Sequence, residues 1–142
     1  MKKLILVVLF LSGWTSGASA QVAVIAHKSV PVDTVTSSEL LDCYSGEVRL
    51  WRNGQPIIIF DLKPKGKVKE KFYEYIGKTS SRMKSIWMVN MLSGEGDPPQ
   101  SLESEDEMLK KVAATKGSIG FISKTKISHD VKVLAILEQK NK

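Results

Sequence analysis

Alternating lysines around a glycine form the strongest candidate for chemistry in this sequence. Five of them flank Gly66, just where an apolar helical pattern begins: Lys63, Lys65, Lys67, Lys69 and Lys71. A helix N-terminus presents free N–H groups and partial positive charge, so it attracts anions. Lysines there oppose the helix dipole, and a bound anion would relieve that conflict. The pattern predicts an anion site on Gly66 and the first three lysines; the alternative is a solvated basic surface.

A second set of polar side chains follows the first expected strand. His27, Ser29 and Asp33 lie in one loop, and loops after strands often hold ligands in α/β sheets. His27 and Ser29 therefore join the candidate anion ligands, although a half-exposed histidine without a ligand is the simpler interpretation of His27. His129, beside Asp130 in an expected surface turn, lacks the ligand spacing of a zinc site. No G-x-S-x-G elbow is present, so we expect no enzyme, no metal and no cofactor.

The first half of the chain alternates between strand and helix patterns. Residues 22–26 are a continuous apolar, β-branched run that predicts a buried strand. Thr36 and Glu39 have capping-box spacing for a helix that Gly46 ends. Residues 57–60 form a second apolar run after Pro56. Cys43, the only cysteine, lies in the first helical pattern, where a buried thiol is expected.

The second half continues the alternation. Val68, Phe72 and Ile76 recur at steps of four and predict a helix. Thr79 or Ser80 caps another helix, whose apolar positions are Met83, Ile86, Trp87 and Met91. Its Trp87 is expected to be buried between helix and sheet, as a core anchor like Trp51. Residues 93–99 hold two glycines and two prolines and cannot be helical.

The last elements complete a layered α/β pattern. Ser104 and Glu107 predict a second capping box, and Gly117 ends that helix. A strand over residues 118–122 contains Gly120, which indicates close backbone approach. The final strand, residues 131–137, follows after a short connection, which favours antiparallel pairing between these two strands. Alternating strands and helices predict an α/β domain with a mixed sheet.

The N-terminus has the three parts of a secretory signal. Lys2 and Lys3 precede an apolar run, and small residues end at Ala20, so cleavage before Gln21 is expected. The run is too short to span a bilayer, which predicts a signal peptide over residues 1–20, a domain over 21–142 and a periplasmic location. Removing Lys2 and Lys3 from the 21 basic residues leaves 19 against 15 acidic residues, a net charge of +4. For an exported protein this excess favours small anions or acidic surfaces over nucleic acid.

Several segments together resemble the phosphate-type periplasmic substrate-binding proteins of ABC transporters. Residues 40–46 and 51–57 are similar to the family's "aromatic-x-Gly, then Trp-x-x-Gly-x-Pro-Ile" stretch. Phe72 in a helix after a glycine-containing turn, and Trp87 before residues 93–99, follow in the family's order. Residues 115–122 resemble the family's "Thr-Pro-Gly-Ala-Ile-Gly-Tyr-Val". The resemblance implies one lobe of a type II periplasmic-binding-protein-like fold.

Two departures from the family shape the functional expectation. The full family has two lobes that close on an anion, and this chain is roughly half that length. The family's phosphate turn, Asp-Gly-Ser-Gly-Thr preceded by Arg, corresponds here to residues 61–68, where only a glycine survives. The resemblance implies a binder of phosphate or a similar oxyanion, in uptake or sensing, with an ABC transporter or envelope protein as partner. The alternative is a non-enzymatic interaction module that kept the fold without the ligand.

Overall fold

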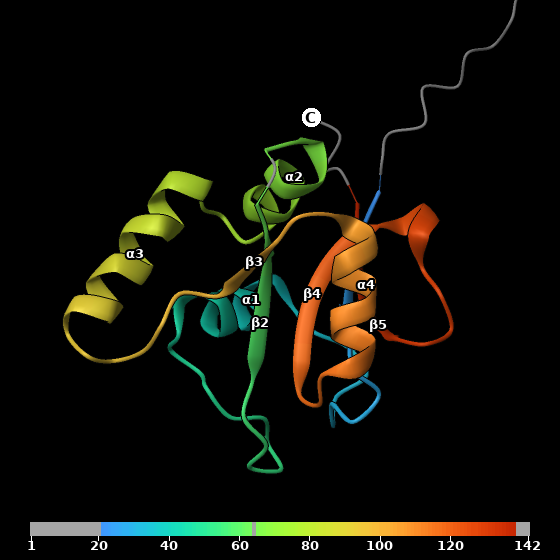
Figure 1. Cartoon of the computed structure of the whole chain (residues 1–142), viewed down its shortest axis with the longest axis horizontal. Coiled ribbons are helices and arrows are strands. Elements are labelled where there is room, and N and C mark those ends of the chain that lie inside the picture. The colour runs from blue at the N-terminus through green and yellow to red at the C-terminus, as the bar shows by residue number, and fades with distance from the viewer. Residues whose placement is uncertain (1–20, 64, 139–142) are drawn as a thin grey trace, which may run out of the picture.

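The computed structural model describes residues 21–63 and 65–138, so the expected signal at residues 1–20 lies outside the described residues. Strands and helices alternate along the chain (Figure 1), in the order β1 Val22–Ala26, α1 Ser37–Ser45, β2 Ile58–Leu62, α2 Lys67–Tyr75, α3 Ser80–Leu92, β3 Gln100–Leu102, α4 Glu105–Ala114, β4 Ser118–Ser123, a 3-10 turn Lys124–Lys126 and β5 Lys132–Leu137. The expected α/β domain with a mixed sheet is confirmed.

The sheet has the strand order β3-β2-β4-β1-β5. β2 runs parallel to both β3 and β4, whereas β1 is antiparallel to β4 and to β5. The expected direct pairing of the last two strands is wrong, because β1 is inserted between them. The short connection after Ser123 carries the chain past β1 rather than back along β4, so the antiparallel character of the sheet comes from β1 alone among the described strands.

Helices cover both faces of this sheet, as adjacent residues of β4 show. A Cβ added to Gly120 would lie 2.4 Å from Met108 Sδ and 3.2 Å from Val112 Cγ2 of α4, which confirms the close approach expected there. The next side chain, Phe121, points to the opposite face and stacks on Phe72 of α2, with ring centroids 4.0 Å apart and planes 7° apart. Thus α4 covers one face, and α1 and α2 cover the other.

An aromatic cluster joins α1 and α2 to the sheet. The Tyr44 ring meets Phe72 edge-on at 4.8 Å, and the buried Tyr44 hydroxyl donates to the carbonyl oxygen of Phe60 at 2.8 Å. That hydrogen bond satisfies the one polar atom of a fully buried side chain, so burial costs little. Cys43, one residue before Tyr44, is buried as expected.

The capping residues set the helix boundaries much as the sequence predicts. Thr36 Oγ1 accepts from the N–H of Glu39 at 3.2 Å, and Glu39 Oε2 accepts from the N–H of Thr36 at 2.9 Å. Gly46 ends α1 with a φ of 79°. At α4, Ser104 Oγ accepts from the N–H of Glu107 at 3.1 Å, but the Glu107 carboxylate accepts from the N–H of Glu103, one residue earlier than in a capping box. The starts of α1 and α4 are therefore fixed by side chains close in sequence.

The helix α3 stands away from the sheet and packs against α1 and α2 (Figure 1). The expectation that Trp87 is largely buried between helix and sheet holds in part, because Trp87 packs against the core from α3. Trp87 is half-buried, donates from Nε1 to the carbonyl oxygen of Tyr44 at 2.6 Å and meets the Tyr73 ring edge-on at 6.5 Å. Trp51, by contrast, is buried as expected and donates from Nε1 to the carbonyl oxygen of Gly117 at 2.9 Å.

Candidate functional site

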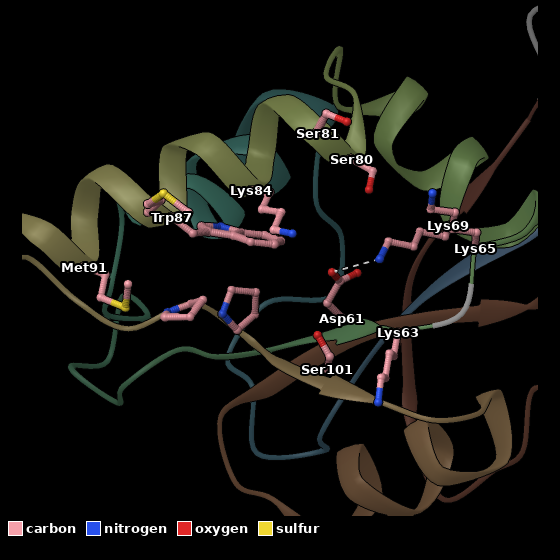
Figure 2. Close-up of a pocket in the computed structure, with 13 residues that line it drawn as sticks. Asp61, Lys63, Lys65, Lys69, Ser80, Ser81, Lys84, Trp87, Met91 and Ser101 are labelled. Atoms are coloured by element: carbon pink, nitrogen blue, oxygen red, sulfur yellow. Dashed lines mark ion pairs between the residues drawn. The ribbon is translucent and has the colours of Figure 1, made fainter.

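A cavity of about 530 Å³ opens beside the carboxyl end of β2 (Figure 2). Its walls come from the end of β2 and the turn after it, from α2, from one side of α3 and from the segment that leads into β3. The lining residues are Asp61, Lys63, Lys65, Lys69, Ser80, Ser81, Lys84, Trp87, Met88, Met91, Pro98, Pro99 and Ser101. Cavities of this size hold small organic ligands in other proteins.

The topology explains why these residues meet. β2 and β3 run parallel, with Phe60 opposite Gln100 and Leu62 opposite Leu102, so the turn after β2 and the chain around β3 share one edge of the sheet. Helix α2 begins after Gly66 at that edge, and no side chain of residues 21–63 or 65–138 caps its N-terminus. α3 packs mainly on α1 and α2, and the cavity lies between α3 and the end of β2.

An ion pair lies in the wall of the cavity, at the end of β2. Lys69 Nζ is 3.5 Å from Asp61 Oδ2 and donates to the carbonyl oxygen of Leu62 at 2.6 Å. Asp61 Oδ1 accepts from the N–H of Leu62 at 2.9 Å. The exposed fractions of the two charged side chains are 13% for Lys69 and 3% for Asp61, so water screens this pair weakly. The sequence predicts that this strand ends at residue 60, which is wrong. Hydrogen bonding between β2 and β3 continues past residue 60, so β2 includes the buried carboxylate of Asp61.

Burial changes the acidity of the groups around this pair. Burial raises the pKa of Asp61, and the nearby charge of Lys69 opposes that shift. Burial raises the pKa of Tyr73 as well, and the negative charge of Asp61 adds to that shift. The buried Tyr73 hydroxyl has no hydrogen-bond partner among the described residues. Asp61 and Lys69 therefore offset each other's charge inside the cavity.

The remaining lysines give the cavity an excess of positive charge. Lys84 reaches from α3 toward the centre of the cavity, and Lys65 lies beside Lys69 at the α2 end (Figure 2). Among the described residues, no acidic side chain pairs with Lys65 or Lys84. Lys63 differs, because it forms an ion pair at 3.1 Å with Glu103 and its amine points away from the cavity. Two ammonium groups thus remain available to an anion.

The structure brings together only part of the predicted anion site. Lys63 and Lys65 line the cavity, and Gly66 is the residue before α2. Lys67, the first residue of α2, is exposed and does not line it. The turn around Gly66 therefore forms part of the cavity wall. Of its three lysines, only Lys65 both lines the cavity and has no acidic partner among the described residues.

His27 and Ser29 do not lie at this cavity. β1 runs opposite to β2, so the loop after β1 is at the other edge of the sheet, where the N–H of His27 donates to the carbonyl oxygen of Ser118 at 3.0 Å. Ser29 Oγ is 2.8 Å from His27 Nδ1 and accepts from Gln55 Nε2 at 3.2 Å and from the N–H of Gly117 at 3.1 Å. These contacts connect the loop after β1 to the loops that contain Gln55 and Gly117. His27 and Ser29 therefore hold these three loops together.

Sequence reasoning missed the contributions of α3 and β3. Lys84, Trp87, Met88 and Met91 share one side of α3, with Ser80 one turn before them and Ser101 opposite. Their spacing of three and four residues is the signal that could have found them. The same spacing is typical of a core-facing helix, which is how Trp87 and Met91 are interpreted from the sequence alone.

The described residues contain no group of three or more His, Cys, Asp or Glu side chains placed to hold a metal ion. No helix in residues 21–63 or 65–138 is long and apolar enough to cross a bilayer.

The fold has clear relatives among solved structures, although no protein-family model and no curated protein matches the sequence. A putative phosphate ABC transporter substrate-binding protein with bound phosphate, from Clostridium perfringens, superimposes with a TM-score of 0.67 at 20% identity, over 81% of this chain and 45% of its own. An ABC-type phosphate transport receptor from Vibrio cholerae gives 0.64 at 19% identity, over 81% and 46%. A possible phosphate binding protein from Planctomyces limnophilus gives 0.59 at 14% identity, over 81% and 41%.

The chain spans less than half the length of these proteins. At identities of 14–20% the likeness shows the fold and not the ligand. The mixed five-stranded sheet flanked by helices agrees with the resemblance seen in the sequence. The protein has the fold of a single lobe of a phosphate-type periplasmic substrate-binding protein.

Proposed function

We propose that this protein is an exported, non-enzymatic binding protein for phosphate or a similar oxyanion, in uptake or in sensing. The observation that carries the proposal is the cavity at the end of β2, where Lys65 and Lys84 have no acidic partner in the part of the chain that the structure describes. The uncapped N-terminus of α2 at the same edge adds N–H groups and partial positive charge. The solved relatives that share the fold are phosphate-transport receptors, which supports an anion as ligand and an ABC transporter component as partner.

Titration calorimetry with phosphate and with sulfate tests this proposal. The site is open on one side and its charges are partly screened, so we expect weak binding that falls further as salt is added. The variant Lys65→Glu/Lys84→Glu reverses the two unpaired charges and should abolish the binding heat. The matched control Lys110→Glu/Lys116→Glu makes the same change in net charge at exposed positions outside the cavity and should bind like the wild type.

Two results would overturn the proposal. Equal heats from the wild type and both variants would mean that the anion binds elsewhere or without a site. No heat from the wild type at millimolar anion would leave no role for the cavity in anion recognition.

The second candidate function is an interaction module for an envelope protein. The observation that favours it is the apolar surface of α3 outside the cavity, where Val89 and Leu92 are 64% and 78% exposed. Exposed apolar patches of this kind mark protein contacts. If this surface binds a partner in the envelope fraction, Val89→Asp/Leu92→Asp should abolish co-purification of that partner and leave the anion heat unchanged.

A further inference from the structure

The cavity beside β2 is apolar at one end and cationic at the other. Met91 lies at one end and Lys65 and Lys69 at the other, with Trp87 between them along the α3 wall (Figure 2). Pro98 and Pro99 add apolar surface to the lining. The single acidic side chain of the lining, Asp61, is already paired with Lys69. The two ends therefore favour different parts of a ligand.

From this arrangement we infer that the ligand is an organic oxyanion, such as a phosphomonoester that carries an aryl or alkyl group. The inference rests on the proposed function, because it uses the same cavity and the same unpaired lysines. The anionic head would lie between Lys65 and Lys84, and the organic group would lie against Trp87 and Met91.

The size of the cavity supports this ligand class over inorganic phosphate. A volume of about 530 Å³ is in the range of pockets that bind small organic molecules through apolar walls and a few polar groups. An inorganic anion would contact the lysines and leave the Trp87 and Met91 side of the cavity to water. Filling that side with an apolar group removes apolar surface from water, which is the main source of affinity for such ligands.

The exposed side chains on the α3 wall of the cavity indicate that this wall is not simply a part of the core. Met88 and Met91 are 51% and 48% exposed, whereas Met83 on the same helix is fully buried. Methionine side chains adapt to ligands of irregular shape, because they are unbranched and polarizable. The sulfur atoms at this wall are thus available to an organic group that enters from solvent.

A comparison of three probes tests the inference: inorganic phosphate, phenyl phosphate and phenol, each titrated into the full domain by calorimetry. We expect phenyl phosphate to bind about tenfold or more tightly than inorganic phosphate, the gain typical of a buried six-carbon ring. Phenol, which lacks the charge, should bind more weakly than phenyl phosphate by a similar factor.

Two variants on α3 locate the effect. Met91→Ser replaces a cavity side chain, and Leu92→Ser changes the neighbouring residue, which is 78% exposed and outside the cavity. Met91→Ser should reduce the preference for phenyl phosphate severalfold and leave the affinity for inorganic phosphate unchanged, whereas Leu92→Ser should change neither. If Met91→Ser lowers the melting temperature, Met88→Ser provides the same test at a second wall position.

The outcomes separate this inference from the function on which it rests. Equal affinities for inorganic phosphate and phenyl phosphate would overturn the organic ligand and keep the anion site. Absence of binding by both anions would overturn both proposals. Phenol that binds as tightly as phenyl phosphate would overturn the role of the lysines, and an unchanged preference in the Met88 and Met91 variants would overturn the role of the α3 wall.

Discussion

Lys69 Nζ lies 2.6 Å from the carbonyl oxygen of Leu62 and 3.5 Å from Asp61 Oδ2, so one ammonium group links α2 to the end of β2. The same nitrogen is 6.0 Å from the centre of the Tyr73 ring. This contact holds the start of α2 against the sheet and compensates a carboxylate that is almost fully removed from water. The consequences for stability differ between the two partners.

Loss of the lysine should be more costly than loss of the acid. Lys69→Met leaves the Asp61 carboxylate buried without a counter-charge, and breaking a buried pair in this way costs about 3 kcal/mol. Asp61→Asn leaves Lys69 its hydrogen bond to Leu62, so we expect a cost of less than about 2 kcal/mol. Urea unfolding of the two variants at neutral pH measures both values, and an equal or reversed order would contradict the arrangement described here.

The Asp61 carboxyl should also make stability depend on pH. Burial raises its pKa in the folded protein, so the folded state keeps this proton at pH values where the unfolded chain has lost it. The contribution of Asp61 to the free energy of unfolding therefore falls as pH rises from the ordinary carboxyl pKa to the raised value, and is constant above it. Measured against Asp61→Asn by urea unfolding across this window, the wild type should lose relative stability with rising pH. If the wild type instead gains stability relative to Asp61→Asn as pH rises, the charge of Lys69 lowers the pKa of Asp61 more than burial raises it.

Gly117 is the glycine at which a methyl group should be least tolerated. A Cβ there would lie 2.4 Å from the carbonyl oxygen of Pro56, and its φ of 76° disfavours other residues. Gly77 is the matched control, with a φ of 74° and nothing within 4 Å of an added Cβ. We expect Gly77→Ala to cost about 1 kcal/mol for the backbone conformation alone. Gly117→Ala should cost about 1–3 kcal/mol more, because backbone must shift; thermal unfolding of both variants compares them, and similar costs would contradict the close approach to Pro56.

The thiol of Cys43 should be inert in the folded protein. Burial raises its pKa to about 11, and the charges of Asp42 and Glu39 add to that shift. Since the thiolate is the reactive form, Ellman's reagent at about pH 8 should modify Cys43 only after denaturation. Rapid labelling of the native protein would show that α1 opens locally, and hydrogen exchange of the α1 amides would then be fast as well.

Cleavage of the expected signal is tested by intact mass. The pattern from Lys2 to Ala20 predicts that protein recovered from the exported fraction begins at Gln21. An Ala20→Arg change replaces the small residue at the cleavage site, and the uncleaved form should then accumulate. Recovery of the wild type with Met1 intact in the exported fraction would contradict processing.

Local patterns predicted the individual elements well, because their determinants are close in sequence. The Thr36 and Glu39 capping box and the strand at residues 22–26 are confirmed at the residue level. The pairing of strands depends on residues far apart, and the insertion of β1 between β4 and β5 left no local signal. The direction of β1, which depends on the same distant residues, places His27 and Ser29 at the edge opposite the lysines.

The cavity was harder to predict than the fold. Periodicity shows which side chains share a side of α3, but it does not distinguish a wall that meets the core from one that meets solvent. Met83 and Met91 fit the same apolar pattern, yet the first is buried and the second lines the cavity. The position of Asp61 in the cavity wall could not be predicted either, since a charged residue after an apolar run normally indicates that the strand has ended.

The position of β1 in the sheet also has a consequence for the order of folding. Its two hydrogen-bonded neighbours are β4 and β5, the last strands of the chain, with Val22 opposite both Ser123 and Leu137. Contacts between such distant residues carry a large loop-closure entropy and form late. A chain emerging from the ribosome therefore cannot pair β1 with its neighbours until nearly the whole sequence has been made. During that interval the apolar residues 22–26 have no native partner, and an incomplete chain that ends before β4 should be a substrate for chaperones or proteases.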